Sequence, residues 1–253
     1  MRMAVYVVSD LHGHMDVFME GLNKIGFSDE DKLYVIGDAI DRGPKGIELL
    51  SYIMEHENMD LLLGNHEYMM LDVVDPEGGA YCIGNDTTLW LYYNGGKVTF
   101  EAYSKLSGDE RKALLSWLNH RMLIKVVEAG GIRFCLTHSF YIPKCEGQEF
   151  CEMDTDYAWA IVWASMFRDG DTKCKDIYAN YDYTFITGHV PVQRVRAEYL
   201  RDRNYNRLES YRFRNFVDID GGCAIGFKKN VKNGAIFLRL DDMEEFAVEI
   251  MKP

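Results

Sequence analysis

Two carboxylates and a guanidinium lie close together in the segment Gly37-Asp38-Ala39-Ile40-Asp41-Arg42-Gly43. The segment follows a short apolar run, which predicts a buried strand. Ligands of α/β proteins gather at the ends of such strands. An aspartate there suits a hard metal ion, and the planar fork of an arginine suits a phosphate. The segment therefore predicts a metal-assisted phosphate site around Asp38 and Arg42.

Further metal-competent side chains follow two neighbouring predicted strands. Asp10 and His12 come directly after an apolar run over residues 3–9, and Asn65 follows a short run over residues 60–63. Helical patterns separate these runs, and strand–helix alternation predicts parallel strands that all end at one edge of a sheet. Asp10, His12, Asp38 and Asn65 are therefore expected to converge.

Two later histidines also end predicted strands. His138 follows residues 132–137, and His189 follows residues 183–187. Together with the first four side chains they supply enough donors for two divalent ions, with Asp38 as the bridging carboxylate. Mixed imidazole and carboxylate ligands favour Mn, Fe or Zn. The predicted metal ligands are Asp10, His12, Asp38, Asn65, His138 and His189.

The residues beside these ligands suit the chemistry of phosphate transfer. Two metal ions can activate one water and clamp the oxygens of a phosphate. His66 would protonate the leaving group, and Asp41 would fix its tautomer and raise its pKa. Arg42 would bind the non-bridging oxygens of the phosphate.

The bulk properties limit the classes of protein. With 253 residues and 47% hydrophobic content, residues 1–253 are expected to form a single domain. A net charge of −12 disfavours nucleic acid and anionic membranes as partners. The first apolar run is read as a strand and not a signal peptide, so a cytoplasmic protein is expected. The six cysteines form no CxxC pair and are expected to be reduced, with Cys145 and Cys151 the one pair worth testing for a disulfide.

The remaining segments are assigned from periodicity. Residues 68–119 are predicted to be mainly helical, and residues 122–129 and 132–137 to form a hairpin. Residues 140–156 read as a loop, residues 157–167 as a helix, and residues 194–214 receive no assignment. The strands predicted last span 216–219, 235–240 and 246–251. The tryptophans and Met69-Met70 are interpreted as core residues.

Each motif alone has a plain structural explanation. Asp10-Leu11-His12 could be a solvated turn, Asn65-His66-Glu67 a helix cap, and Gly188-His189 a turn at a strand end. All of them together, in one order along the chain, favour a common site.

This order resembles the calcineurin-like metallophosphoesterases, and within them the bacterial and phage members of the phosphoprotein phosphatase branch. The matching motifs are Ser9 to Gly13, Gly37 to Gly43, Gly64 to Glu67, His138 and Gly188-His189, and residues 90–99 also look like the bacterial branch. The resemblance implies an α/β fold in which a β-sandwich of mixed sheets is flanked by helices. It also implies a dinuclear site with the ligand and acid roles given above.

The chain departs from the family pattern at three points. Ser9 stands where many members have glycine, and Ser139-Phe140 follow His138 where Ala-Gly is usual. A second phosphate-binding arginine has no clear motif, and Arg168 is the candidate. The predicted phosphate-binding residues are thus Arg42, Asn65 and Arg168.

The expected activity is a dinuclear metal-dependent phosphomonoesterase that resembles serine/threonine protein phosphatases. A metal-bridging hydroxide would attack phosphorus directly, without a phosphoenzyme. The alternatives are a symmetrical dinucleoside tetraphosphatase, which shares the motifs, and a non-catalytic phosphate-binding module. The expected partner is a phosphoprotein or a small phosphorylated or nucleotide substrate, and the oligomeric state is left open.

Overall fold

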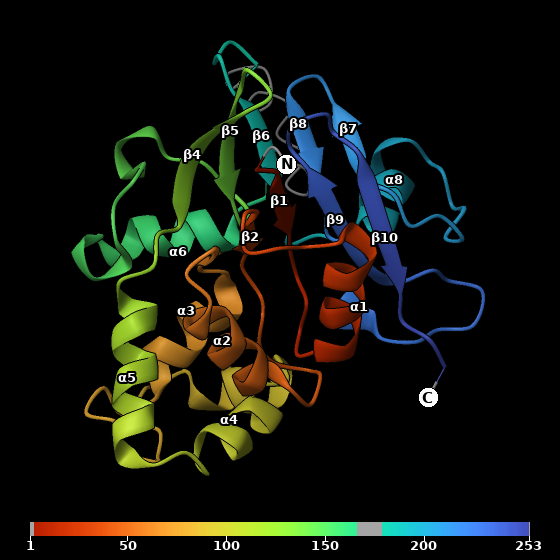
Figure 1. Ribbon diagram of the computed structural model, residues 1–253. Coiled ribbons are helices and arrows are strands. Elements are labelled where there is room, and N and C mark those ends of the chain that lie inside the picture. The colour runs from red at the N-terminus through yellow and green to blue at the C-terminus, as the bar shows by residue number, and fades with distance from the viewer. Residues whose placement is uncertain (1–2, 166–178, 253) are drawn as a thin grey trace.

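The computed structural model describes residues 3–165 and 179–252 (Figure 1). Two five-stranded sheets, each with parallel and antiparallel pairs, face the interior, and helices flank them. The predicted α/β class with mixed sheets and flanking helices is confirmed. No helix in the described residues is long and apolar enough to cross a membrane.

The first sheet has the order β10-β9-β1-β2-β3. Strands β1, β2 and β3 run parallel, as the sequence predicted, and Val8 lies opposite Val35, which lies opposite Leu61. Because the register aligns the carboxyl ends, the loops that follow the three strands lie side by side. The strands span Val5–Val8 (β1), Lys32–Ile36 (β2), Met59–Leu62 (β3), Gly234–Arg239 (β9) and Glu245–Glu249 (β10).

The second sheet has the order β4-β5-β6-β8-β7. The predicted hairpin β4–β5 forms its edge, and β5, β6 and β8 are parallel. A second set of parallel strand ends therefore faces the same region as the first. The strands span Ile124–Ala129 (β4), Ile132–Thr137 (β5), Thr184–Thr187 (β6), Tyr211–Phe213 (β7) and Phe216–Asp218 (β8).

The helices α1 (Met15–Ile25) and α2 (Gly46–Glu55) make the crossovers between the first three strands. Each buries an apolar face, with Phe18 and Leu22 from α1 and Leu49 and Leu50 from α2. Figure 1 shows α1 beside β10, and α2, which contacts α1, lies near α4.

The middle of the chain is mainly helical, as predicted. Helices α2 to α5 gather at one side of the strands (Figure 1). A five-residue π-helix, η1, interrupts the series directly before the Asn94-Gly95-Gly96 break. The elements span Asn65–Val73 (α3), Leu89–Tyr93 (η1), Lys97–Tyr103 (α4) and Gly108–Asn119 (α5).

The segment 140–163 differs in part from the prediction. Two short 3-10 turns, Pro143–Cys145 and Phe150–Glu152, lie within the expected loop. Helix α6 spans Thr155–Trp163, so it begins before the predicted residue 157, because Asp154 caps its first turn by accepting the N–H of Asp156. Cys145 and Cys151 are free thiols rather than a disulfide.

The unassigned segment 194–214 contains most of helix α8 (Val192–Tyr199) and all of strand β7. Arg196 is buried and donates from Nη1 to the carbonyl of Glu209 and from Nη2 to that of Arg207, both at 2.8 Å. The periodicity of the sequence could not indicate this contact, because one long side chain joins an irregular stretch to a short helix.

The core fills the space between the sheets and under the helices, and Met69 and Met70 belong to it, as predicted. The prediction for the tryptophans is only partly right. Trp90 is fully buried, whereas Trp159 is 55% exposed. Trp163 lies edge-on to His189, with ring centroids 6.1 Å apart. One of the predicted core tryptophans therefore faces solvent and another contacts a candidate site residue.

The edges of the two sheets are joined through Glu245 on β10. Its carboxylate accepts hydrogen bonds from the backbone N–H and hydroxyl of Ser210, at 2.9 and 2.5 Å, and from Arg212 on β7 at 2.6 Å. This contact helps to fix the first sheet against the second, and each sheet delivers part of the candidate site.

Candidate metal centre

The loops after β1 and β2 are hydrogen-bonded to each other along their length. Asp10 N–H donates to the carbonyl of Gly37 at 3.1 Å, and His12 N–H donates to that of Asp38 at 2.8 Å. Gly43 N–H returns a bond to His12 at 3.0 Å. The two loops therefore form one unit that holds Asp10, His12 and Asp38 at fixed positions.

This unit and the loop after β6 contain residues in a sparsely populated backbone conformation. Among the described residues ten non-glycine residues have positive φ, and six of them are Asp10, His12, Asp38, Asp41, Arg42 and His189. Such conformations are unfavourable for side chains with a Cβ and persist where the surrounding structure determines them, often at functional sites.

Three acceptor atoms from three different segments meet at the end of the second sheet. His138 Nε2 lies 3.1 Å from Asn65 Oδ1 and 3.2 Å from His189 Nδ1, and the last two atoms are 3.0 Å apart. Asp38 Oδ1 lies 3.5 Å from His138 Nε2. The structure thus brings together four of the six predicted ligands.

The tautomer of His138 shows what this group can bind. Its Nδ1 lies 3.0 Å from the carbonyl of Ile36, which can only accept, so Nδ1 carries the proton and Nε2 presents a lone pair. Backbone carbonyls orient metal-binding imidazoles in this way. Ligand atoms about 2.1 Å from one ion are separated by roughly 3 Å. The donor set therefore fits a divalent cation.

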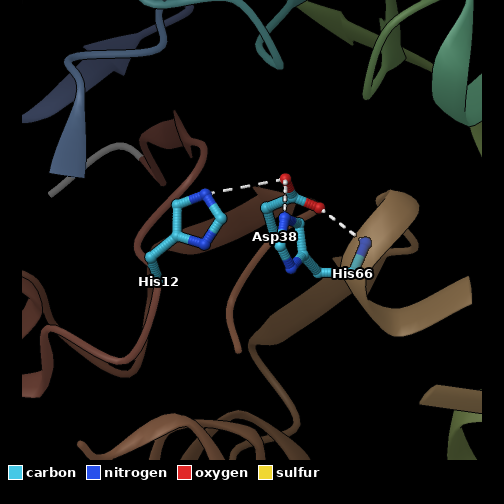
Figure 2. Close-up of side chains that lie close together, drawn as sticks. All are labelled: His12, Asp38 and His66. Carbon is cyan, nitrogen blue, oxygen red and sulfur yellow. Dashed lines mark hydrogen bonds and ion pairs between the residues drawn. The ribbon is translucent and has the colours of Figure 1, made fainter. Parts of the chain in front are cut away.

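A second group lies on the other side of Asp38 (Figure 2). His12 Nε2 lies 3.6 Å and His66 Nε2 lies 3.8 Å from Asp38 Oδ2. His12 Nδ1 lies 3.0 Å from the carbonyl of Ile40, so its Nε2 also presents a lone pair. Since one oxygen of Asp38 faces each group, its position between them suits a bridging carboxylate.

Asp10 belongs to neither of these converging groups of ligand atoms in the described chain. Its carboxylate is buried in the same pair of loops, and Oδ2 accepts the backbone N–H of His189 at 3.0 Å. This contact links the loop after β1 to the loop after β6, so it couples the two sheets beneath the candidate site.

Burial gives the candidate ligands strongly shifted pKa values. It raises the pKa of Asp38 well above its usual range, and the nearby charges of Asp10 and Glu67 raise it further. Burial also raises the pKa of Asp10 and lowers that of His12 well below its usual value. A cation bound here would supply the compensating charge that these buried groups need.

Glu67 was not singled out by the sequence reasoning, yet it organises the central loop. Its carboxylate is fully buried and accepts four backbone N–H groups: Gly64 and Asp38 at 2.9 Å, Ala39 at 2.8 Å and Ile40 at 3.3 Å. A Cβ on Gly64 would lie 2.2 Å from Asp38 Oδ1, so only glycine permits this close approach. An acid at the third position of the helix, three residues after the N-cap Gly64, was the available signal.

His66 and Asp41 form a buried pair beside the metal ligands. His66 Nδ1 lies 2.6 Å from Asp41 Oδ2, which also accepts the indole N–H of Trp90 at 2.8 Å. Burial raises the pKa of Asp41 to about 7, although hydrogen bonds from Thr99 and Trp90 oppose the shift. Trp90 lies in π-helix η1, and such irregular turns are frequent at functional sites.

The expected rise in the pKa of His66 is wrong in direction. Burial lowers that pKa well below its usual value, and the charges of Arg42 and His138 lower it further. Arg42 Nη2 lies 3.2 Å from His66 Nε2, so in this arrangement Nε2 accepts a hydrogen bond and Nδ1 carries the proton. Burial is the largest cause of this lowered pKa.

The segment after η1 also supports Arg42. Arg42 N–H donates to the carbonyl of Gly95 at 3.2 Å, and Asp41 N–H donates to the hydroxyl of Thr99 at 2.9 Å. Gly95 has a φ of 82°, and a Cβ there would lie 2.9 Å from the Arg42 side chain. Residues 94–99 therefore position both Asp41 and Arg42.

A cavity of about 890 Å³ opens over these residues. Its lining includes Asp38, Asn65, His66 and Arg42 at one end. Asp220, which sequence reasoning missed, also lines it and is almost fully buried, and burial raises its pKa well above the usual range. Like the other acids it follows an apolar strand, so the same strand-end pattern would have found it. Arg168 lies outside the described residues.

Residues 3–219 match the model of a family described as calcineurin-like phosphoesterase. The chain belongs to this family. Calcineurin-like phosphoesterases use divalent metals, and the arrangement of histidine and aspartate side chains around Asp38 agrees with that chemistry.

Curated relatives of this phosphoesterase include symmetrical bis(5'-nucleosyl)-tetraphosphatases. That of Neisseria gonorrhoeae is 36% identical over 98 residues, which are 38% of this chain and 36% of the relative. That of Delftia acidovorans is 29% identical over 150 residues, or 58% and 48%. The matches thus span less than half of the length of either relative.

Solved structures resemble the phosphoesterase over almost its whole length. A candidate diadenosine tetraphosphatase has a TM-score of 0.61 at 14% identity, with 99% of this chain and 95% of that chain covered. A cold-active protein-tyrosine phosphatase of Shewanella has a TM-score of 0.54 at 16% identity, with 98% and 81% covered. At these identities the likeness concerns the fold alone.

Proposed function

We propose that this calcineurin-like phosphoesterase is a dinuclear metal-dependent hydrolase. One ion would be held by Asp10, His12 and Asp38, and the other by Asp38, Asn65, His138 and His189. The observation that carries the proposal is the convergence of Asn65 Oδ1, His138 Nε2 and His189 Nδ1 within 3.2 Å beside a buried shared carboxylate. Mn, Fe and Zn suit this donor set.

The two ions, when bound, would activate a water for direct attack on phosphorus and neutralise the charge of the phosphate. The chain itself supplies the remaining groups. The Arg42 guanidinium, whose side chain lines the cavity, would bind two non-bridging oxygens of the phosphate, and the Asn65 amide would contact a third.

His66 is placed to protonate the leaving oxygen. Asp41 fixes Nδ1 as the protonated nitrogen, which directs Nε2 to the cavity. Acid catalysis needs a second proton on Nε2, and the negative charge of a bound phosphate would favour it. Binding of that phosphate would also draw Arg42 away from Nε2.

The first candidate substrates are phosphate monoesters, including phosphoserine and phosphothreonine in proteins. The motif order that resembles bacterial protein phosphatases supports this class. The His66–Asp41 pair also supports it, since an alkoxide leaving group needs a proton donor.

The second candidate is a symmetrical dinucleoside tetraphosphate. Two observations favour it: the names of the curated relatives and a cavity that extends well beyond the predicted metal ligands. The partner would then be a small nucleotide rather than a protein.

A panel of phosphosubstrates tests both candidates. The purified protein is incubated with p-nitrophenyl phosphate, a phosphothreonine peptide and diadenosine tetraphosphate, each with Mn, Mg, Zn or Fe. Release of inorganic phosphate from the peptide supports the first class, and formation of two nucleoside diphosphates supports the second. Absence of metal-dependent turnover on every substrate would contradict the proposed hydrolase and favour a phosphate-binding module.

A further inference from the structure

The far wall of the catalytic cavity is a connected structure. It is formed by helix α8, by residues 203–205 and by a turn at residues 228–231. The N–H of Lys232 donates to the carbonyl of Tyr205 at 3.0 Å, which joins the last two segments. Arg196 on α8 donates to the carbonyls of Arg207 and Glu209, which follow residues 203–205 in the chain. The backbone of this wall is therefore fixed across from the candidate metal centre, and it presents the exposed side chains of Arg203 and Lys228.

Two cations on this wall have no ionic partner within residues 3–165 and 179–252. Arg203 and Lys228 line the cavity, and neither forms an ion pair with any residue in the described ranges. Arg194, also on the wall, is paired with Glu198 at 3.5 Å. In a protein with a net charge of −12, uncompensated cations inside a cavity create a local attraction for anions.

These cations are separate from the one that serves the candidate metal centre. Arg42 comes from the loop after β2 and lies 3.2 Å from His66, at the end of the cavity that holds the predicted ligands. Arg203 and Lys228 come from segments that follow α8 and η4 (Cys223–Ile225). The acids on the lining besides Asp38 are Glu198, which pairs with Arg194, and the buried Asp220.

We infer, building on the proposed function, that Arg203 and Lys228 form a second phosphate subsite. It would hold a phosphate of the substrate other than the one under attack. The substrate class is then a small molecule with a chain of linked phosphates, such as a nucleoside polyphosphate. A guanidinium and an ammonium bind neighbouring phosphate oxygens well, the first as a fork and the second as a point charge. A monoester with one phosphate has no group for this subsite.

Equilibrium binding tests the subsite without relying on turnover. Inorganic tripolyphosphate and orthophosphate are titrated by calorimetry into the wild-type protein and the Arg203→Gln/Lys228→Gln double variant, in one metal-containing buffer. The wild type is expected to bind tripolyphosphate at least about tenfold more tightly than orthophosphate. The double variant should reduce this preference by about tenfold or more, since it removes both charged contacts to the additional phosphates.

Matched controls are Arg201→Gln and Lys229→Gln, which remove exposed cations next to the subsite that do not line the cavity. Both should keep the wild-type preference. An equal preference in the wild type and the double variant would overturn the subsite. A loss of the tripolyphosphate preference in the two control variants as well would also overturn it, because the loss would then reflect the overall charge of the protein.

Turnover of p-nitrophenyl phosphate separates the two proposals. If the wild type hydrolyses it while the double variant keeps the preference for tripolyphosphate, the hydrolase stands and the subsite fails. If the wild type hydrolyses no substrate, but prefers tripolyphosphate and the double variant does not, the subsite stands and the proposed hydrolase fails.

Discussion

The carboxylate of Glu67 accepts the backbone N–H of Asp38 at 2.9 Å. The same carboxylate accepts the N–H groups of Ala39, Ile40 and Gly64. The position of Asp38 is therefore set by a contact outside its own loop as well. A buried acid on the first turn of α3 gathers the loop after β2 and the loop after β3, and so sets the carboxylate that faces both candidate metal groups.

Replacing Glu67 with Gln should destabilise the protein by about 2–4 kcal/mol and abolish metal binding. The amide presents an NH₂ group where two buried N–H donors need an acceptor. Chemical unfolding in urea and metal analysis of the purified variant measure the two effects. Glu55→Gln, an exposed change on α2, is the control and should shift the free energy of unfolding by less than about 0.5 kcal/mol. A Glu67→Gln variant with wild-type stability and metal content would contradict this role.

Replacing Asp38 with Asn should lower kcat for p-nitrophenyl phosphate by at least about a thousandfold, because both candidate ions lose a charged ligand. Metal content measured by mass spectrometry should fall from two ions to one or none. Asp29→Asn, in an exposed loop, serves as the control for loss of one negative charge. Near wild-type turnover in Asp38→Asn would rule out the proposed mechanism.

Replacing His66 with Asn should leave both metals bound but slow the hydrolysis of esters with poor leaving groups. Loss of a general acid reduces rates by about 10²–10⁴-fold when the leaving oxygen needs a proton. Phenyl phosphate should therefore slow far more than p-nitrophenyl phosphate, whose leaving group is stable as an anion. Equal slowing of both substrates would contradict the acid role. Loss of metal would show that His66 is a ligand, since its Nε2 lies 3.8 Å from Asp38 Oδ2.

The parallel strands β1 to β3 and the nearness of Asp38 to Asn65 follow from a pattern that sequence alone displays, and His138 and His189 were recognised as later strand ends. Each buried strand ends in polar residues, and strand–helix alternation sets parallel strands with their ends at one edge. Short-range periodicity is sufficient for this result because the strands are apolar and the crossover helices are amphipathic.

The remaining parts of the site depend on contacts between distant segments, which periodicity does not record. Trp90 reaches Asp41 across 49 positions of the chain, and Glu67 reaches Asp38 across 29. Segment 194–214 is fixed by Arg196, a polar residue inside an irregular stretch. The direction of the pKa shift of His66 could be inferred only from the structure, because it depends on how deeply the imidazole is buried.

Glu245→Gln should reduce stability at neutral pH but not in acid. Burial alone would raise the pKa of Glu245, but hydrogen bonds from Ser210 and Arg212 lower it on balance. A carboxylate with a lowered pKa in the folded state stabilises the protein above its unfolded pKa, and this contribution is lost as the pH falls through the folded value. The variant should lose about 1 kcal/mol at pH 7.

Urea unfolding of the wild type and Glu245→Gln, compared at about pH 7 and about pH 4, measures this difference. The difference between the two proteins in the free energy of unfolding should be smaller at the lower pH. Glu244→Gln removes a neighbouring carboxylate that faces Arg239 at the surface rather than Ser210, and its effect should be smaller. A gap that widens in acid would contradict the proposed contribution of the inter-sheet contact.

Replacing Trp90 with Phe should move the acid limb of the kcat–pH profile to higher pH. The indole N–H donates to Asp41 Oδ2 and so favours the ionised carboxylate, whose pKa is about 7 with this bond present. Without the bond that pKa rises, and a larger fraction of Asp41 is protonated and unable to hold the Nδ1 proton of His66. Initial rates between about pH 5 and 9 measure the shift. Trp117→Phe, which alters an indole remote from Asp41, should leave the limb in place, and an unchanged or lower limb in Trp90→Phe would show that Trp90 acts through packing alone.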